Sequence, residues 1–486
     1  MELYTFIASI ITIIYVFLVI QTIFTILLQN RNPLKTHSYI LVLILLPGLG
    51  LIVYFFFGMQ YRRRKKFAKR KIKSSRLLED WRNHYLQIIR DNYELLEERF
   101  GERIKTPKLL FTSENSILTL ENNVEVLRNG EEKFPRLLED LNAAKDHIHL
   151  EYYILSDDDL GNQIIDVLIK KAKEGLTVRV IFDSVGSLSL SNQTVYKMQE
   201  AGVKTGEYLP VRFPRFANKL NFRDHRKIIV IDGKIGYCGG INIDKRYDNR
   251  YLSENPYYWR DTSLRLEGDV VYELQTMFLI TWDFVEEELI LPDEKYFPKN
   301  EVKNRCLSSV VGSGPESQPK IMMDTFFSLI TTAKSDIRIV TPYFIPNESI
   351  LTAITNASKS GVTVEIILPG VSDSKLVQSA TNSFIPPLLE AGVKVYFYQK
   401  GFIHAKIMIV DGEIATVGTA NMDYRSFEQN SEVNVILYNP EVSGVLVNQF
   451  KDDLKESVQV NSDFWQSLSL KQKLFASFAR LFSPIL

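Results

Sequence analysis

The chain has 486 residues, of which 45% are hydrophobic, and its 58 Lys and Arg balance 58 Asp and Glu. This composition excludes a disordered chain, and the even charge excludes recognition of an acidic partner through net charge alone. Two cysteines, Cys238 and Cys306, are too few for a disulfide framework and fit a reducing compartment. The length allows two or three domains.

Two apolar segments open the chain, at residues 4–28 and at about 39–57. Each is close to the ~20 residues that span a bilayer as a helix. A secretory signal peptide is the alternative, but the first segment is too long for one. It also lacks a basic start and a small-residue cleavage site before the second segment. We therefore expect an N-terminal transmembrane helical hairpin over residues 1–60.

Ten Lys or Arg lie between Arg62 and Arg76, directly after the second segment, whereas the short hinge offers only Arg31 and Lys35. The positive-inside rule then predicts a multi-pass cell-membrane protein whose large remainder lies in the cytoplasm. This basic juxtamembrane linker, residues 61–105, could in addition lie on anionic headgroups, or serve only as a topology signal.

From residue 106 the chain consists of two similar halves. In each, a helical segment leads to a short apolar strand, and a second helix runs into a second strand: "IIDVLIKKAKEGLTVRVIFD" matches "ILTAITNASKSGVTVEIILP". Gly175 and Gly361 end these helices, and "EAGVK" occurs at Glu200 and again at Glu390. Strands that alternate with helices predict an α/β fold with a largely parallel sheet in each repeat. We place the repeats at residues 106–290 and 291–460.

The connection before the motif is eleven residues longer in the first half, where it reads "YLPVRFPRFANKLNFRD". Within the 206–223 loop, basic and aromatic side chains interleave, namely Arg212, Phe213, Arg215, Phe216, Lys219, Phe222 and Arg223. The loop is either a lid that touches phosphate headgroups and acyl chains or an ordinary surface loop.

The same motif then follows in each half, as "HRKIIVIDGKIGYCGGIN" and "HAKIMIVDGEIATVGTAN". In both, a His and a Lys two positions apart on a predicted strand share one face. The Asp-Gly pair predicts a tight hairpin turn, which makes the motif Asp a turn or framework residue. Small residues after the hairpin let the backbone approach a ligand, and an Asn adds an amide donor. The matched positions are His225, Lys227, Asp232, Gly240 and Asn242 with His404, Lys406, Asp411, Thr419 and Asn421.

Two such sets facing one another would act on a phosphodiester. One His could attack phosphorus while the other protonates the leaving alcohol and then deprotonates the acceptor. Lys and Asn would stabilise the negative charge of the transition state, a role that metal ions fill elsewhere, so we expect no metal and no cofactor. The other four histidines, which we read as structural, are His37, His84, His147 and His149.

A catalytic His usually needs a carboxylate on its second ring nitrogen. Asp261, in "YWRDTSLRL", and Glu432, in "NSEVNVIL", follow the two motifs in strand-like segments. They are candidates for this orienting role, with surface acids on strands as the alternative.

Together these features resemble the phospholipase D superfamily and, over nearly the whole chain, the bacterial cardiolipin synthase family. The supporting segments are "LPGLGLIVYFFFG", "YWRD", "TPYFIP", "NMDYRSFEQNSE" and "RLFSPIL". The resemblance implies two phospholipase D-like repeats in one bilobal catalytic unit, and phosphatidyl transfer between two phosphatidylglycerol molecules that gives cardiolipin and glycerol. It implies catalytic roles for the His, Lys and Asp of both motifs, with His225 as the nucleophile and His404 as the acid and base; the residue patterns alone leave that choice open.

The C-terminal tail, residues 461–486, mixes apolar residues with Lys471, Lys473 and Arg480, as an interfacial helix does; packing on the catalytic body is the alternative.

Three other functions are alternatives to phosphatidyl transfer. A nuclease would typically have a basic domain, so we expect no nucleic-acid partner. A hydrolytic phospholipase D would differ only in accepting water. Two intact motifs argue against an inactive membrane scaffold.

Overall fold

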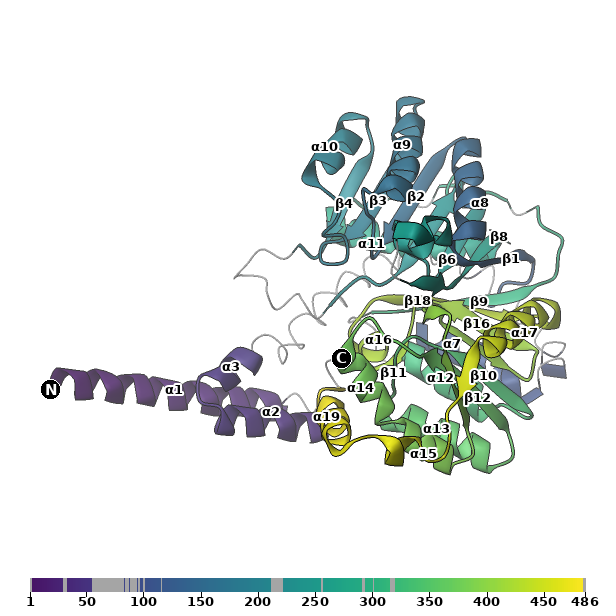
Figure 1. Ribbon diagram of the computed structural model, residues 1–486. Helices are drawn as coiled ribbons and strands as arrows, with labels where there is room; N and C mark the ends of the chain where they lie inside the picture. The colour runs from purple at the N-terminus through teal and green to yellow at the C-terminus, as the bar shows by residue number, and fades with distance from the viewer. Residues whose placement is uncertain are drawn as a thin grey trace.

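The computed structural model describes residues 2–28, 33–54, 101–114, 116–210, 222–254, 257–290, 293–299, 301–314 and 320–483, with isolated positions between 83 and 98. Two α/β lobes lie against one another, and the helices of the N-terminus extend to one side of them (Figure 1).

The first lobe is built on a seven-stranded sheet in the order β1-β8-β6-β5-β2-β3-β4. Its strands are β1 (Asn122–Arg128), β2 (His147–Tyr152), β3 (Thr177–Asp183), β4 (Lys204–Tyr208), β5 (Lys227–Ile231), β6 (Ile235–Gly239) and β8 (Thr262–Gly268). The helices that cover it are α8 (Asn129–Ala143), α9 (Asp159–Lys173), α10 (Asn192–Glu200) and α11 (Val270–Glu286).

The second lobe repeats this arrangement with one strand more, in the order β9-β18-β16-β15-β10-β12-β13-β19. Its strands are β9 (Leu307–Ser313), β10 (Asp336–Val340), β12 (Thr363–Pro369), β13 (Lys394–Tyr398), β15 (Ile407–Val410), β16 (Ile414–Gly418), β18 (Glu432–Tyr438) and β19 (Ser457–Gln459). The main helices are α12 (Ile321–Thr331), α13 (Glu348–Lys359), α14 (Lys375–Asn382), α15 (Ile385–Glu390) and α17 (Pro440–Lys455).

The expectation of a largely parallel sheet is wrong. Within these two sheets, β2-β3-β4 and β10-β12-β13 pair in parallel, whereas all the other neighbouring strands are antiparallel. Helical crossovers produce the parallel part, as the alternating pattern predicts. The motif hairpins reverse the chain within a few residues, and a reversal of this kind gives antiparallel neighbours.

The predicted hairpins are present. Asp232 and Gly233 have φ values of 53° and 64°, and Asp411 and Gly412 have 55° and 65°. Two successive left-handed residues form the turn that joins twisted strands most easily, and Asp-Gly is a preferred pair there. The turns link β5 to β6 and β15 to β16 in register.

Each motif strand contributes to two cores. Ile229 and Ile231 of β5 face the cluster that includes α8, α9 and α10, whereas Ile228 and Val230 face a central cluster. That central cluster also takes in side chains of β15, β16, β18, α11 and α17, so it joins the two lobes. A strand with apolar residues on both faces fits this fully buried position.

A short segment before the first sheet packs on the second lobe. It consists of η3 (Gly101–Ile104) and α7 (Lys105–Glu114). Leu110 of α7 belongs to the core of the second lobe, and Arg103 pairs with Asp411 at 2.7 Å. The expected boundary at residue 106 therefore groups α7 with the wrong repeat.

At the N-terminus, α1 (Glu2–Leu28) is long and apolar enough to cross a membrane. Helices α2 (Pro33–Leu45) and α3 (Leu49–Val53) follow it, separated at Gly48, where φ is 78°. The second expected span, 39–57, is thus not one continuous helix over residues 39–54, and 55–57 lie outside the described residues. Ile26 of α1 packs with Leu43 of α2 and Tyr54, so the two segments lie side by side.

The C-terminal tail contains α18 (Phe464–Ser467) and α19 (Leu470–Leu481). Helix α19 packs on α14, and its Ala479 joins the core of the second lobe. Packing on the body, one of the two expected alternatives, is therefore observed.

Candidate active site

Both motif histidines lie where the two lobes meet. The backbone N–H of His225 donates to the Ser431 carbonyl at 2.9 Å, and that of His404 donates to the Arg260 carbonyl at 2.7 Å. The second contact continues the parallel pairing of β7 (Tyr258–Arg260) with β14 (Gly401–Ile403). Each motif is thus anchored by backbone hydrogen bonds to the opposite lobe.

The orienting carboxylates are exchanged between the lobes. His225 Nδ1 lies 2.9 Å from Glu432 Oε2, and His404 Nδ1 lies 2.8 Å from Asp261 Oδ2. Because a carboxylate only accepts, each Nδ1 carries the proton and each Nε2 keeps its lone pair. The sequence identifies both acids but not the exchange, which appears only once the lobes are assembled.

Glu432 is held by three further donors. Its Oε2 accepts from Thr419 Oγ1 at 2.6 Å, and its Oε1 accepts from Ser426 Oγ at 3.0 Å and Asn430 Nδ2 at 3.3 Å. Burial alone would raise the pKa of Glu432, but its contact with His225, the hydrogen bond from Thr419 and the nearby charge of Lys227 hold it below its usual value. Glu432 is therefore a carboxylate at neutral pH.

Gly240 and Thr419 occupy matching positions with different uses. A Cβ on Gly240 would lie 2.2 Å from Asp261 Oδ1, so glycine makes room for that carboxylate. The Thr419 hydroxyl donates its single hydrogen to Glu432 and accepts from the Val433 N–H at 2.9 Å, so it has no second hydrogen to donate to a phosphate oxygen. Both positions thus support the orienting acids, and contact of their backbone with a phosphate stays a prediction.

Two lysines are buried beside the histidines. Lys227 Nζ donates to the His225 carbonyl at 2.8 Å, and Lys406 Nζ donates to the His404 carbonyl at 2.5 Å. Lys406 Nζ also lies 3.0 Å from His404 Nε2. Burial lowers the pKa of Lys227 to about 8 and that of Lys406 to about 7. An anionic ligand beside these lysines would raise both pKa values and so favour the charged ammonium forms.

Burial also lowers the pKa of His225 to about 4 and that of His404 to about 3, with the neighbouring lysines acting in the same direction. Both imidazoles are therefore neutral at pH 7 in the free protein. A neutral ring with a free Nε2 lone pair is the form that can attack phosphorus.

The two motif asparagines differ. Asn242 Oδ1 accepts from the Ile154 N–H at 3.2 Å and its Nδ2 donates to Tyr247 OH at 2.6 Å, so this amide is structural. The side chain of Asn421 has no such pair of partners, and its buried Oδ1 is unpaired among the described residues. Of the two, Asn421 is the amide left for a ligand, and toward a phosphate oxygen it would have to use its Nδ2 donor, because Oδ1 only accepts.

The motif aspartates lie at the far ends of their strands from the histidines. Asp232 accepts from the backbone N–H groups of Lys145, Asp146 and His147 at 2.8–3.0 Å. Asp411 does the same for the loop before β10. These contacts make Asp232 and Asp411 framework residues that fix the hairpin to the neighbouring strand, and they correct the direct catalytic role that the resemblance implies.

The surroundings of the two histidines are unequal. His404 is enclosed by the rings of Tyr247, Trp259 and Phe402 at 5.5–5.7 Å, and 7% of its side chain is exposed. His225 meets the ring of Tyr153 at 5.0 Å and is 12% exposed.

Lys133 of α8 is a further lysine buried beside the site, and it is not among the residues that the sequence predicts to act there. Its Nζ donates to Tyr152 OH at 2.8 Å and to the Ile241 carbonyl at 2.7 Å, next to the first motif. Burial lowers its pKa to about 7, although the charge of Asp261 opposes this. The available signal is its spacing, because Lys133 shares a helix face with the buried Leu137 and Leu141.

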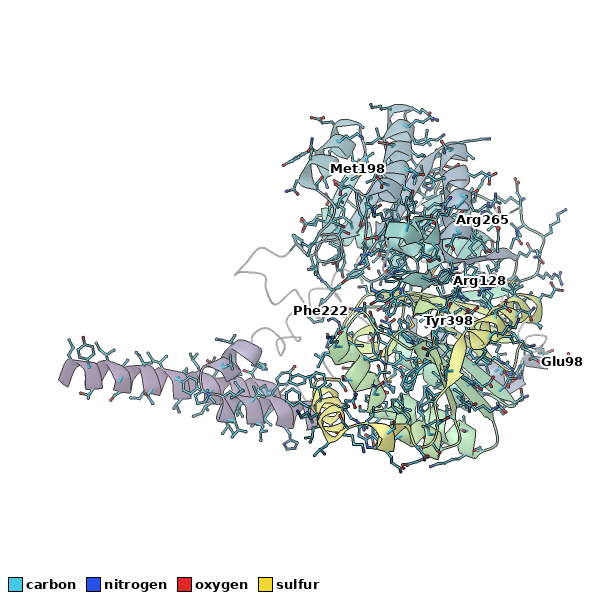
Figure 2. The ribbon with its side chains drawn as sticks, in the orientation of Figure 1. Glu98, Arg128, Met198, Phe222, Arg265 and Tyr398 are labelled. Atoms are coloured by element: carbon cyan, nitrogen blue, oxygen red, sulfur yellow. The ribbon has the colours of Figure 1, made fainter. Side chains whose placement is uncertain are left out.

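Other predicted residues are structural. Arg223, from the loop expected to be either a lid or an ordinary surface loop, is buried and pairs with Asp183 at 3.2 Å. Phe222, labelled in Figure 2, is also buried. The rest of that loop, 211–221, lies outside the described residues. His147 and His149 are buried in β2, as expected, while His37 is exposed on α2 and His84 is not among the described residues.

Known proteins support one family for the whole chain. The family model described as "Cardiolipin synthase, PLD-like domain" matches residues 137–278 and 326–454, and "Phospholipase_D-nuclease N-terminal" matches residues 7–58. Cardiolipin synthase 2 of Bacillus cereus is 40% identical over 95% of this chain and 88% of its own. Cardiolipin synthase of Alkalihalophilus pseudofirmus is 41% identical over 94% of this chain and 90% of its own.

Among solved structures, phosphatidylserine synthase of Haemophilus influenzae matches with a TM-score of 0.58 and 18% identity, over 79% of this chain and all of that one. This likeness supports the two-lobed fold alone. The family models and the near full-length relatives go further: the chain belongs to the cardiolipin synthases, phosphatidyltransferases built from two phospholipase D-like domains.

Proposed function

We propose that the two lobes form one phosphatidyl-transfer centre, with one phosphatidylglycerol as donor and a second as acceptor. The observation that carries this proposal is the exchange of carboxylates, because neither motif has its His–carboxylate pair within its own repeat. A repeat alone would lack an oriented imidazole, so the two lobes act as one unit.

In the first step, the Nε2 lone pair of His225 attacks the donor phosphorus. A P–N bond forms, the P–O bond to the headgroup glycerol breaks, and His404 gives a proton to the departing oxygen. His225 contacts one aromatic ring whereas His404 contacts three, and this more open surrounding supports the assignment of His225 as nucleophile that the superfamily resemblance implies. His404 must gain its proton before this step, and an incoming phosphodiester anion raises the pKa of His404 in the direction required.

In the second step, His404 takes the proton of a hydroxyl on the acceptor headgroup. That oxygen attacks phosphorus, the P–N bond breaks, and His225 is regenerated with cardiolipin as product. Lys227, Lys406 and the Asn421 amide would stabilise the negative charge on the non-bridging oxygens in both steps. Because every step is reversible, added glycerol drives the reaction backwards.

Water could replace the acceptor hydroxyl, and the protein would then act as a hydrolytic phospholipase D. The aromatic enclosure of His404 favours transfer, since it limits water near the base.

For the membrane part we propose a two-segment hairpin with both termini in the cytoplasm. The pairing of α1 with α2 and the charge bias around residues 31–76 support it. A cysteine placed at Asn32 should react with an impermeant reagent outside intact cells, and one near Asn300 should not. Outside labelling near Asn300 would contradict the topology.

The direct test of function is incubation of the purified protein with phosphatidylglycerol, followed by identification of the lipids and of free glycerol. Cardiolipin and glycerol in equal amounts are expected. Phosphatidic acid as the main lipid product would identify a hydrolase. The double variant His225→Ala, His404→Ala provides the baseline.

The covalent route has its own test. With His404 replaced by Ala and a donor with a good leaving group supplied, a phosphatidyl adduct should accumulate on His225, since such a group departs without an acid. Mass spectrometry of the digest locates it. An adduct on His404 in the His225→Ala protein would reverse the assignment, and burst release without an adduct in either protein would contradict the covalent route.

A further inference from the structure

The C-terminal helix α19 turns its small side chains inward and its large ones outward. Ala476 and Ala479 are 2% and 0% exposed, and Ala479 shares a buried cluster with Ala380 of α14. Leu474, Phe478 and Leu481, by contrast, are 62%, 53% and 75% exposed. A helix that only packs on a globular body does the opposite, because large apolar side chains gain most from burial.

The exposed side chains form one continuous stripe. Leu470, Leu474, Phe478 and Leu481 are spaced by four, four and three residues, which places them on one helix face. Phe475 beside them is also exposed. Contiguous apolar surface of this kind marks an interaction site rather than ordinary exposure.

The charged side chains that α19 itself carries are all positive, although Glu348 and Glu390 of the body line the cavity that Arg480 and Leu481 border. From Phe464 to the end of the sequence there is no Asp or Glu, while Lys471, Lys473 and Arg480 are present. The guanidinium of Arg480 lies 4.5 Å above the ring of Phe384, which holds it at the edge of the helix. Apolar side chains flanked by cations fit the headgroup region of an anionic bilayer.

The helix is also preformed. Ser469 and Gln472 make a reciprocal capping box at its N-terminus, so the helix needs no bilayer in order to fold. Helix α1 of the same chain is long and apolar enough to cross a bilayer, which would keep α19 close to that membrane. In Figure 1, α19 (yellow) lies on the side of the body from which the N-terminal helices extend.

We propose that α19 lies flat in the headgroup region of an anionic bilayer, with its apolar stripe toward the acyl chains, and thereby seats the second lobe on the membrane. Arg480 and Leu481 line a cavity together with Tyr424, the first residue of α16 (Tyr424–Glu428). Ser426 of α16 hydrogen bonds to Glu432. The face of α19 that would contact the bilayer therefore lies beside α16, whose Ser426 supports Glu432, the carboxylate that orients His225.

The test uses the full chain in vesicles of phosphatidylglycerol and phosphatidylcholine. Cys238 and Cys306 are buried, so a single added cysteine can be labelled selectively with a fluorophore. The sites are Leu474→Cys and Phe478→Cys, with Leu188→Cys as the matched control, an 81% exposed apolar residue of the first lobe. Lipids with spin labels on their acyl chains and aqueous iodide serve as quenchers.

We expect acyl-chain quenching of the labels at 474 and 478 to exceed that of the control by about threefold or more, and iodide quenching to fall below it. Equal quenching at all three sites would overturn the proposal. So would cross-linking of the 478 cysteines between two molecules at full yield in detergent, which would identify the stripe as an interface between copies. Neither readout depends on turnover, so this proposal and the proposed function can fail separately.

Discussion

The two motif copies match in spacing but differ in what surrounds them. Around His404, three rings exclude solvent and the orienting acid is the short side chain of Asp261, for which Gly240 leaves space. Around His225 the site is more open, and the longer Glu432 is held by four hydrogen bonds, one of them from Thr419. A duplicated sequence can therefore supply two different chemical environments, which is what a nucleophile and an acid–base pair require.

The largest effect should come from the histidines themselves. His225→Ala and His404→Ala should each reduce cardiolipin formation by about 10³-fold or more, since loss of either member disables the whole unit. The double variant should be little worse than either single one. Quantification of cardiolipin from phosphatidylglycerol in detergent micelles measures this, and retention of half the activity in either single variant would mean two independent sites.

The orienting acids come next, with losses of about 10- to 100-fold for Glu432→Gln and Asp261→Asn, because each fixes the tautomer and angle of its histidine. A donor with a good leaving group should separate them. It needs no acid, so burst release by Asp261→Asn should recover while that by Glu432→Gln stays low.

Thr419→Val is the matched milder change, because it removes one donor from Glu432 and leaves Asp261 untouched. We expect a loss smaller than that of Glu432→Gln and no recovery with the good leaving group. If burst release with the good leaving group recovered in Glu432→Gln as well as in Asp261→Asn, the two acids would not serve different steps of the reaction.

The sequence predicts those features of the site that depend on residues close together along the chain. Asp-Gly turns, the pairing of His with Lys on one strand face, and Asp261 and Glu432 as candidate acids all follow from local spacing. The exchange of acids does not, because it depends on contacts 143 and 207 residues apart along the chain. The burial of Lys133 is not predicted for a related reason. A lysine on a helix usually indicates a solvent-exposed face, and only the structure shows that its apolar neighbours on that face are buried. A largely parallel sheet does not form because the helical crossovers build only three strands of each sheet, whereas the motif hairpins add antiparallel strands to the same sheets.

A smaller effect is expected on stability as the pH falls. The folded-state pKa values of His225 and His404, about 4 and 3, lie below the unfolded value of 6.5. Below pH ~6.5 the unfolded chain binds protons that the native site does not, so the free energy of unfolding decreases as pH falls toward 4, by up to ~1.4 kcal/mol per pH unit for each histidine. Thermal unfolding in detergent between pH 7.5 and 5 measures it. The double His→Ala variant should show a flatter dependence, and an identical slope would contradict the assigned shifts.

The smallest effect should come from chelators. In the proposed mechanism Lys227 and Lys406 supply the positive charge that a metal ion would otherwise bring to the phosphate. Each donates to the carbonyl of its own motif histidine, which holds the ammonium group beside that ring. Phosphatidyl transfer in detergent micelles should therefore persist in excess chelator, with the micelle composition held constant because divalent ions also alter lipid packing. Lys227→Met and Lys406→Met should each lose most activity, and added divalent metal should not restore it. Complete loss of phosphatidyl transfer in chelator, reversed by one specific metal, would contradict this prediction. It would show that a metal ion, bound by oxygen or nitrogen ligands near the two histidines, supplies positive charge that the lysines alone do not.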